Sequence, residues 1–453
     1  MMSLALLAEV LRAPLVGADA TFTGVSTDTR TLARGDLFVA LVGPNFDGHS
    51  FLSEAIAKGA AGALLSRPLD TPLPYVRVRE TRLALGEFAA FWRRQFPIPV
   101  IAVTGSNGKT TVKEMIGRIM SETGPGCVTR GNLNNDIGVP LTLARLRAAD
   151  RFAVIEMGMN HPGEIDYLSR LTAPSIAVIT NAAEAHLAGV GSLDRIARAK
   201  GEIFAGLDPS GVAVLNADDR YCEFWRGLVG ARRIVTFGLD HPADVSATYR
   251  LEDDGCAVRL KTPAGEIELR LGLIGKHNVL NALAAVAAAL SAKATLADIA
   301  CGLAKVKPVA GRLEIKQGVN GARVIDDTYN ANPASLRAGL HVLKEAKGER
   351  VLALGNMGEL GADAGDMHRR AGATARELGI QRLYGVGELA ALAVHSFGEG
   401  GRQFASAEAL IDALINSMHA DMVVLVKGSR VMRMERVVAG IVRRAADAAS
   451  GGA

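Results

Sequence analysis

Cysteine is scarce in this sequence, and its few occurrences lie far apart. The 453 residues include four cysteines, Cys127, Cys222, Cys256 and Cys301, and no two of them stand at CxxC spacing. Zinc sites and disulfide frameworks are built from closely spaced cysteines, so neither is expected here. Reduced thiols are typical of a cytoplasmic protein, which is the location we predict.

Aromatic residues are few, and no charge of one sign dominates. Phe, Trp and Tyr make up 5% of the chain, and the formal net charge is only +4, with Lys and Arg scattered along the sequence. Proteins that bind nucleic acid concentrate basic side chains and stack aromatic rings on bases. We therefore expect no nucleic-acid partner.

Long hydrophobic runs are also missing. The most hydrophobic segment, residues 279–292, is shorter than the roughly 20 residues that cross a bilayer, and it contains Asn281. Residues 1–10 are apolar but have no basic residue before them and include Glu9, unlike a signal peptide. We expect one buried helix and one N-terminal helix here, and no membrane insertion.

The sequence is rich in apolar runs that alternate with helical patterns, which favours an α/β fold. A chain of 453 residues exceeds what one hydrophobic core usually supports. We predict a smaller α/β N-terminal domain over residues 1–97, a central parallel-sheet domain over 98–310, and a Rossmann-like domain over 311–453. The last contains no GxGxxG, so its pattern predicts no dinucleotide cofactor.

Short runs that are apolar throughout mark the expected strands. They are 152–155, 176–179, 212–215 and 234–237 in the central domain, and 324–326, 351–354, 383–386 and 423–426 in the third. Such runs suit a parallel sheet that is covered on both faces. Because ligands gather at the carboxyl ends of parallel strands, polar residues that follow the runs, such as Glu156, are candidate site residues.

A glycine loop, TGSNGKTT over residues 104–111, lies between an apolar run and a helical stretch. Gly105 and Gly108 let backbone N–H groups turn toward one point, and the helix N-terminus behind them favours an anion. Lys109 adds a full positive charge, and Thr110 adds a hydroxyl of the kind that ligates Mg²⁺ beside a nucleotide. The usual P-loop has four residues between its glycines, whereas this one has two, so the loop is a variant.

Two further residues fit a metal site at the same sheet edge. Glu156 ends one expected strand, and His186 lies just beyond the strand 176–179. Each residue alone has an ordinary structural reading, as a solvated strand end and a loop histidine. Together, downstream of a phosphate loop, they favour a Mg²⁺ shell that Thr110 begins.

These stretches together resemble the Mur ligases of bacterial cell-wall synthesis, over nearly the whole chain. The resemblance implies an ATP-dependent carbon-nitrogen ligase that forms an amide through an acyl phosphate. It implies that Lys109, His186 and Lys200 are catalytic, with Lys200 carbamylated, and that Thr110, Glu156, His186 and Lys200 hold Mg²⁺. The residues implied to bind ATP are Gly105, Ser106, Asn107, Gly108, Lys109, Thr110, Thr111, Asn278, Asn281, Arg312 and Asp327.

Within the family, the DDTYNANP and LGNMGELG stretches, residues 326–333 and 354–361, are similar to members that join D-alanyl-D-alanine to a UDP-N-acetylmuramoyl-tripeptide. The resemblance implies these two substrates. We predict that the chain works as a monomer. The residues implied to contact substrates are Ser26, Asp28, Arg30, His49, Asn134, Asn135, Asn330 and Asn332. No DNPR motif, which marks diaminopimelate-adding members, is present.

Several alternatives stay open at this point. The loops at 26–30 and 46–49 also fit ordinary turns, and Lys200 also fits a solvated helix lysine paired with Glu202 or Asp194. The phosphate loop is compatible with another Mur-type ligase, with folylpolyglutamate synthase, and with a nucleotide-switched binding protein that has no ligase activity.

Overall fold

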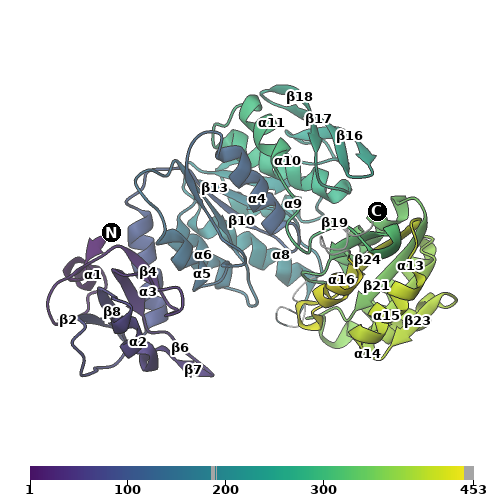
Figure 1. Ribbon diagram of the computed structural model, residues 1–453. Coiled ribbons are helices and arrows are strands. Elements are labelled where there is room, and N and C mark those ends of the chain that lie inside the picture. The colour runs from purple at the N-terminus through teal and green to yellow at the C-terminus, as the bar shows by residue number, and fades with distance from the viewer. Residues whose placement is uncertain (185–188, 190, 443–453) are drawn as a thin grey trace, which may run out of the picture.

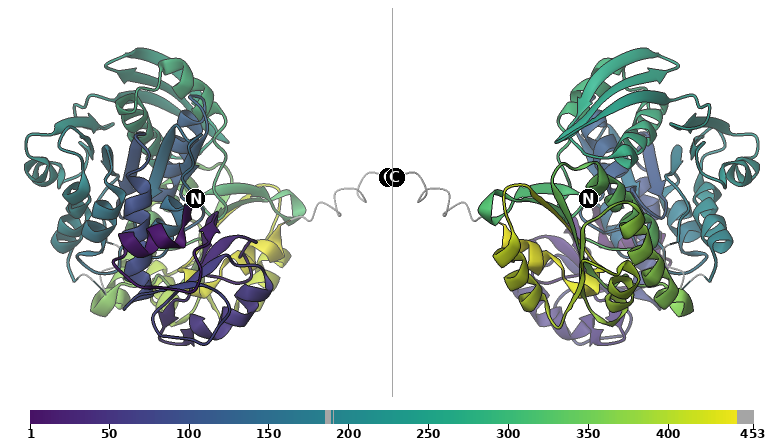
Figure 2. Two further views of the ribbon diagram at one scale, coloured as in Figure 1. Left: turned by 90° about the vertical axis from the view of Figure 1, so that its left-hand side faces the viewer. Right: turned by 90° about the vertical axis from the view of Figure 1, so that its right-hand side faces the viewer.

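The computed structural model describes residues 1–184, 189 and 191–442, so His186 lies outside the described residues. The chain forms three lobes, each with its own sheet (Figure 1). The side views in Figure 2 show the first and third lobes at the same end of the central lobe. The α/β fold class predicted from the sequence is confirmed.

The first lobe contains a five-stranded sheet in the order β2-β9-β8-β5-β4. Its strands are β2 (Leu15–Val16), β4 (Gly24–Ser26), β5 (Asp36–Val39), β8 (Gly62–Leu65) and β9 (Tyr75–Arg77), and its helices are α1 (Leu4–Val10), α2 (Leu52–Ala57) and α3 (Thr81–Arg93). A short pair, β1 (Met2–Ser3) with β3 (Thr21–Phe22), and the hairpin of β6 (Val42–Gly43) and β7 (Phe46–Asp47) complete it. The expected N-terminal helix therefore begins only at Leu4, because Ser3 caps it by accepting from the N–H of Leu6.

The central lobe contains a parallel sheet in the order β11-β12-β10-β13-β14-β15. Its strands are β10 (Val100–Thr104), β11 (Gly126–Val128), β12 (Phe152–Glu156), β13 (Ile176–Ile179), β14 (Val212–Asn216) and β15 (Arg233–Phe237). The helices around it are α4 (Lys109–Met120), α5 (Gly138–Leu143), α6 (Glu164–Thr172), α8 (Leu193–Gly201), α9 (Cys222–Val229), α10 (Lys276–Ser291) and α11 (Leu296–Ala304). Helix α10 is almost fully buried, as its composition predicts, because its many alanines allow close packing against α4 and the sheet.

A three-stranded antiparallel sheet on this lobe was not predicted from the sequence. It consists of β16 (Ser246–Glu252), β17 (Gly255–Thr262) and β18 (Gly265–Leu271). Strand β17 buries alternate residues, including Val258 and Leu260, against the core, whereas its other face carries charged side chains. A search for continuous apolar runs does not find strands with this period of two.

The third lobe contains a six-stranded sheet in the order β19-β20-β24-β21-β22-β23. Its strands are β19 (Glu314–Gln317), β20 (Arg323–Asp327), β21 (Glu349–Gly355), β22 (Arg382–Val386), β23 (Gly401–Phe404) and β24 (Met422–Lys427). Its helices are α12 (Pro333–Glu345), α13 (Ala364–Glu377), α14 (Glu388–Phe397), α15 (Ala407–Ser417) and α16 (Glu435–Ile441). Only β19 is antiparallel to its neighbour, so the carboxyl ends of β20, β21 and β24 share one edge.

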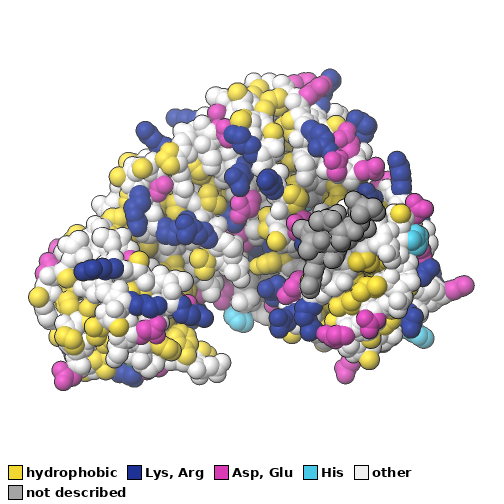
Figure 3. Space-filling model, viewed as in Figure 1, with side chains coloured by type: hydrophobic (Ala, Val, Ile, Leu, Met, Phe, Trp, Pro, Cys, Tyr) yellow, Lys and Arg dark blue, Asp and Glu magenta, His cyan; other side chains and the backbone are white. Residues whose placement is uncertain are grey.

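Helix α3 joins the first lobe to the central one. Its Leu85 and Phe88 belong to the first core, whereas Ala89 packs into the central core. The Arg93 guanidinium donates to the carbonyl of Thr172 at 3.0 Å, and the Trp92 indole donates to the carbonyl of Leu146 at 3.2 Å. These contacts anchor the first lobe, and a wide notch separates it from the third lobe (Figure 3). Among the described helices, none is long and apolar enough to cross a membrane.

Candidate functional site

The phosphate loop requires its two glycines. Gly105 has a φ of +147°, and a Cβ there would lie 1.9 Å from Thr180 Oγ1. Gly108 has a φ of +81°, and a Cβ there would lie 2.4 Å from Asn281 Oδ1. Any side chain at either position would strain the backbone and collide with a neighbouring element. The loop is therefore packed tightly against the residue after β13 and against helix α10.

Hydrogen bonds from the end of β13 hold the loop in shape. The backbone N–H of Asn107 donates to Asn181 Oδ1 at 3.0 Å, and the Thr180 hydroxyl donates to the Asn107 carbonyl at 2.6 Å. Gly108, which has no side chain, caps helix α4, so no side chain from that position covers the first N–H groups of the helix. An anion can bind to these N–H groups, as the sequence analysis expects.

Lys109 stands at the first position of α4. Its ammonium donates to the carbonyls of Gly105 at 2.7 Å and Ser106 at 3.3 Å. Burial lowers the pKa of Lys109, the nearby Glu156 raises it, and Arg312 lowers it. A cation that burial destabilises gains most when an anion arrives beside it, so Lys109 is well placed to meet a phosphate.

Glu156 offers a carboxylate oxygen at the end of β12. Its Oε1 accepts from Asn134 Nδ2 at 2.8 Å and from the Thr110 hydroxyl at 3.3 Å. Its Oε2 is buried and has no hydrogen-bond partner within the described parts of the chain. A buried carboxylate oxygen without a donor is costly to leave unpaired, and this oxygen points to a cation that is not part of the chain. The described residues contain no cluster of three or more His, Cys, Asp and Glu side chains.

Lys200 lies near the end of α8 with a side chain that is buried. Only 1% of the residue is exposed, and its Nζ has no hydrogen-bond partner among the residues described. Burial lowers its pKa well below the ordinary value, and the charge of Lys109 lowers it further. Neither expected carboxylate pairs with it, because Glu202 accepts from the N–H of Gly163 at 2.8 Å and Asp194 accepts from the Tyr221 hydroxyl. Lys200 is thus no solvated helix lysine.

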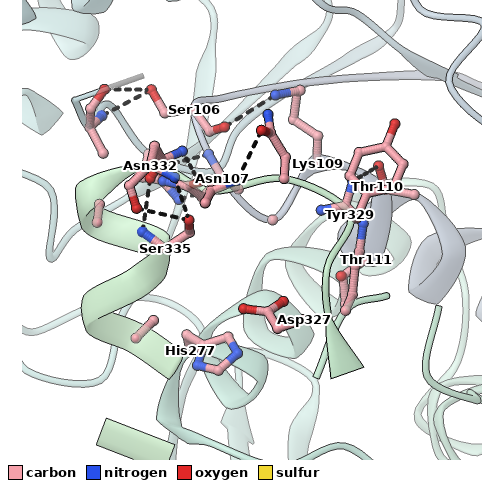
Figure 4. Close-up of a pocket in the computed structure, with 18 of the residues that line it drawn as sticks. Ser106, Asn107, Lys109, Thr110, Thr111, His277, Asp327, Tyr329, Asn332 and Ser335 are labelled. Atoms are coloured by element: carbon pink, nitrogen blue, oxygen red, sulfur yellow. Dashed lines mark hydrogen bonds between the residues drawn. The ribbon is translucent and has the colours of Figure 1, made fainter. Parts of the chain in front are cut away.

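The third lobe supplies the opposite wall of a cavity of about 460 Å³ over the phosphate loop. Figure 4 shows Asn332 of the third lobe beside Asn107 of the phosphate loop, and the two residues line the cavity with Lys109, Thr110 and Tyr329. Asn332 Nδ2 donates to Asn107 Oδ1 at 2.9 Å, and Arg312 donates to the Thr110 hydroxyl at 3.1 Å. The structure thus brings together residues more than 200 positions apart in sequence.

The residues at the far end of the cavity include two that the sequence analysis missed. Lys427 ends β24 and contacts Asp327 Oδ2 at 2.5 Å, and His277 lies nearby at the start of α10. Burial and the charge of Lys427 lower the pKa of His277 to about 4, so its imidazole is neutral at pH 7. Lys427 could have been found as a charged residue that ends an apolar strand, which is the signal that identified Glu156.

The other predicted site residues divide between the cavity and positions away from it. Ser106, Thr111, Asn134, Asn278, Asn281, Asp327 and Asn330 line the cavity with those already named. Asn135 instead accepts from the N–H of Gly138 at 2.8 Å, in the turn that leads into helix α5. The four predicted residues of the first lobe, Ser26, Asp28, Arg30 and His49, do not line this cavity.

The first lobe places its two polar loops at one edge of its sheet. Ser26 ends β4 and caps the turn that follows, where Arg30 forms an ion pair with Asp28 at 2.7 Å. His49 is buried, with Nδ1 at 2.6 Å from Asp47 Oδ1 and with Nε2 accepting from the N–H of Ser66, just after β8. Both ring nitrogens of His49 are therefore occupied. The Arg30 side chain is 85% exposed, so it can meet a ligand at this edge although its Nε and Nη2 already donate to Asp28.

We predict that replacing Arg30 with alanine weakens the affinity for UDP-sugars by roughly tenfold, because a guanidinium that binds a diphosphate is worth at least one charge-assisted hydrogen bond. Calorimetry of the full chain with a uridine diphosphate sugar measures this. Arg94→Ala, an exposed arginine at the end of α3, is the control and should bind like the unmodified chain. Equal affinity of Arg30→Ala and the control for the UDP-sugar would contradict the prediction that Arg30 contacts the nucleotide.

Comparison with known proteins identifies the family. Models of three Mur ligase domains match the chain, namely the Mur ligase family, catalytic domain over residues 21–93, the Mur ligase middle domain over 103–289, and the Mur ligase, glutamate ligase domain over 311–430. The UDP-N-acetylmuramoyl-tripeptide--D-alanyl-D-alanine ligase of Escherichia coli (strain K12) is 46% identical over 96% of this chain and 97% of its own length.

Two solved structures have the same architecture. A crystal structure of MurF from Acinetobacter baumannii matches with a TM-score of 0.91 and 38% identity, over 97% of this chain and 98% of that one. A MurF ligase from Thermotoga maritima, solved in complex with ADP, matches with a TM-score of 0.82 and 25% identity, over 92% and 96% of the two chains. With such identity along nearly its whole length, the chain belongs to the Mur ligase family.

Proposed function

We propose that this protein is an ATP-dependent amide ligase that joins D-alanyl-D-alanine to a UDP-N-acetylmuramoyl-tripeptide in peptidoglycan precursor synthesis. The observation that carries the proposal is the cavity in which the phosphate loop of the central lobe meets Arg312, Tyr329 and Asn332 of the third lobe. Relatives of this activity match the chain over nearly all of its length. One chain supplies both walls of the cavity, which fits a monomer, and the free cysteines of the described residues fit a cytoplasmic location.

The chemistry follows from the charges around the phosphate loop. A carboxylate oxygen of the tripeptide attacks the γ-phosphorus of ATP, the bond to the β-phosphate oxygen breaks, and ADP leaves an acyl phosphate. The amine of the dipeptide then attacks the acyl carbon, and inorganic phosphate departs as the amide forms. Lys109 and the N–H groups of α4 neutralise charge on the transferred group, and positioning supplies most of the remaining catalysis.

Mg²⁺ fits the residues at the end of β12. The unpartnered Oε2 of Glu156 and the hydroxyl of Thr110 are oxygen ligands of the type that this ion prefers. When bound there, Mg²⁺ would neutralise charge on the phosphates of the nucleotide. His186 and a carbamate on Lys200 are the further ligands that the family resemblance implies, and they stay proposals.

The alternatives fit the observations less well. A folylpolyglutamate synthase or a nucleotide switch could share the phosphate loop, but neither accounts for 46% identity over 96% of the chain to a D-alanyl-D-alanine-adding ligase. Asn330 and the residues Gly358 and Glu359, from the loop after β21, line the cavity where the amine substrate would approach. The ligase and the nucleotide switch differ in whether phosphate release from ATP requires the two substrates.

We expect phosphate release from ATP only when the UDP-linked tripeptide and D-alanyl-D-alanine are both present, because the acyl phosphate must form and then be consumed. A coupled phosphate assay across candidate amines measures this, with meso-diaminopimelate and L-lysine as controls that should give no turnover. Release without either substrate would support a nucleotide switch. Turnover with diaminopimelate or lysine, but not with the dipeptide, would overturn the substrate assignment.

A further inference from the structure

The dipeptide assigned under the proposed function, on which this inference rests, brings a carboxylate that needs a partner in the third lobe. Asn332, one residue predicted to read the dipeptide, is already committed. Its Oδ1 accepts from the N–H of Ser335 at 2.8 Å, and its Nδ2 donates to Asn107 at 2.9 Å. Asn332 therefore caps α12 and links the two lobes, and it keeps only its second Nδ2 hydrogen to donate to a ligand.

Two cations line the cavity elsewhere: Lys427, whose donors are used within the third lobe, and Arg312, whose Nε has no hydrogen-bond partner among the described residues. Lys427 is buried and contacts Asp327 Oδ2 at 2.5 Å and the carbonyl of Asn330 at 2.9 Å. Arg312 donates to the Thr110 hydroxyl, at the end of the cavity where the phosphates bind. A carboxylate that took either of them would compete with a buried ion pair or with the nucleotide.

Arg430 is differently placed. It follows β24 in the short helix η5 (Arg430–Met432), and its guanidinium lies 5.9 Å from the centre of the Tyr329 ring. Arg312 lies over the same ring at 4.2 Å, and Tyr329 lines the cavity. The Arg430 side chain is 66% exposed, and its contact with Glu435 spans 3.6 Å, which is longer than a hydrogen bond. Its N–H donors are therefore exposed beside Tyr329, which lines the cavity, although Arg430 itself is not one of the lining residues.

We propose that Arg430 binds the carboxylate of the D-alanyl-D-alanine substrate and so determines specificity for a dipeptide with a free C-terminus. A guanidinium binds a carboxylate through two parallel hydrogen bonds, and its place over the Tyr329 ring restrains it for that contact. An extended dipeptide spans at most about 7 Å, which suits a ligand lying along one tyrosine ring. Its carboxylate then meets Arg430, and its amine points toward the phosphate end of the cavity.

The neighbouring backbone supports this placement. The N–H of Ser429 donates to the carbonyl of Asn356 at 2.9 Å, which joins the residues before Arg430 to the loop after β21. That loop is the LGNMGELG stretch that the sequence analysis associated with the amine substrate, and its Gly358 lies beside Ser429. Arg430 therefore belongs to the same wall as the predicted dipeptide loop.

The test compares two substrates on the full-length enzyme at saturating ATP and UDP-linked tripeptide. One is D-alanyl-D-alanine, and the other is its C-terminal amide, which lacks the negative charge. We expect Arg430→Ala to lower kcat/KM for the dipeptide by about 10- to 100-fold, the range for losing a charge-assisted pair, and to change kcat/KM for the amide less than about threefold. The KM for ATP should stay the same.

Arg436→Ala is the matched control, because Arg436 is an exposed arginine on α16 that contacts Glu408 at 3.5 Å. It should preserve the preference for the free acid. Equal losses with the acid and the amide in Arg430→Ala, or an unchanged preference, would overturn the assignment of Arg430 alone. Failure of the unmodified enzyme to use D-alanyl-D-alanine at all would overturn the proposed function and this inference together.

Discussion

Replacing Lys109 with alanine is expected to lower the rate of ligation by about 10²- to 10³-fold at saturating ATP, because the variant loses a full positive charge at the transferred phosphoryl group. The structure places the Lys109 ammonium 2.7 Å from the carbonyl of Gly105, at the first turn of α4. From that position the ammonium can move its hydrogen bonds from the two loop carbonyls to phosphate oxygens when ATP binds. Steady-state phosphate release measures the effect.

The fold should survive this change. Lys109 contributes hydrogen bonds to Gly105 and Ser106 but does not belong to a hydrophobic core cluster of the described residues. A thermal unfolding curve separates a catalytic from a structural effect. Lys305→Ala is the control, since Lys305 is an exposed lysine that pairs with Glu122 away from the cavity, and it should keep full activity. Wild-type turnover in Lys109→Ala would mean that the phosphate-loop assignment is wrong.

The parts of the site that sequence reasoning identified are those in which a local pattern carries the chemistry. The phosphate loop is one, because glycines, a lysine and two threonines stand next to each other between a strand and a helix. Glu156 is another, because it ends a continuous apolar run in a parallel sheet. In both cases the residues that matter are adjacent in sequence to the element that positions them.

The site residues that sequence reasoning missed depend on contacts between segments that are distant along the chain. Nothing near His277 in the sequence reveals that Lys427, 150 positions later, lies close enough to lower its pKa. The roles of Asn332 and His49 could also be assigned only from the structure. In the sequence each looks like a ligand-binding side chain, but each makes hydrogen bonds within the protein. Sequence shows the type of a polar residue, but only the structure shows whether its donors and acceptors are already used.

For Lys200 the error is the reverse: the sequence suggests an ordinary surface side chain, whereas the structure shows a buried one without a partner among the described residues. On sequence alone a solvated lysine paired with Glu202 or Asp194 is the simpler interpretation, and the structure contradicts it. The side chain is buried, both carboxylates are engaged elsewhere, and the pKa is lowered well below its ordinary value by burial. Lowering the pKa of a lysine shifts it toward the neutral amine, and only the neutral amine has the lone pair that attacks CO₂.

We expect Lys200→Ala to lose at least about 10²-fold in activity and to regain part of it when excess formate or acetate is added. A carbamate on Lys200 would supply two oxygens and a negative charge, which Mg²⁺ prefers, whereas an unmodified amine supplies neither. Truncation removes that group and leaves a space in which a small carboxylate can take its place. Phosphate release with and without the added carboxylate measures the rescue, and a ¹³C signal from labelled bicarbonate reports the carbamate independently of activity.

Lys113→Ala provides the matched control for rescue. Lys113 is equally buried in the same lobe, but its ammonium donates to Glu114 at 2.6 Å and to the carbonyl of Thr129 at 2.9 Å, so it already has its partners as a cation. Formate should not restore whatever activity that variant loses, and its ¹³C signal should match that of the unmodified enzyme. A fully active Lys200→Ala, or a labelled carbamate signal that persists in it, would show that Lys200 is not the carbamylated residue. Because the Lys200 amine is buried and has no hydrogen-bond partner among the described residues, we expect two results. Formate or acetate should restore activity only in Lys200→Ala, and the ¹³C signal of the carbamate should be lost in that variant.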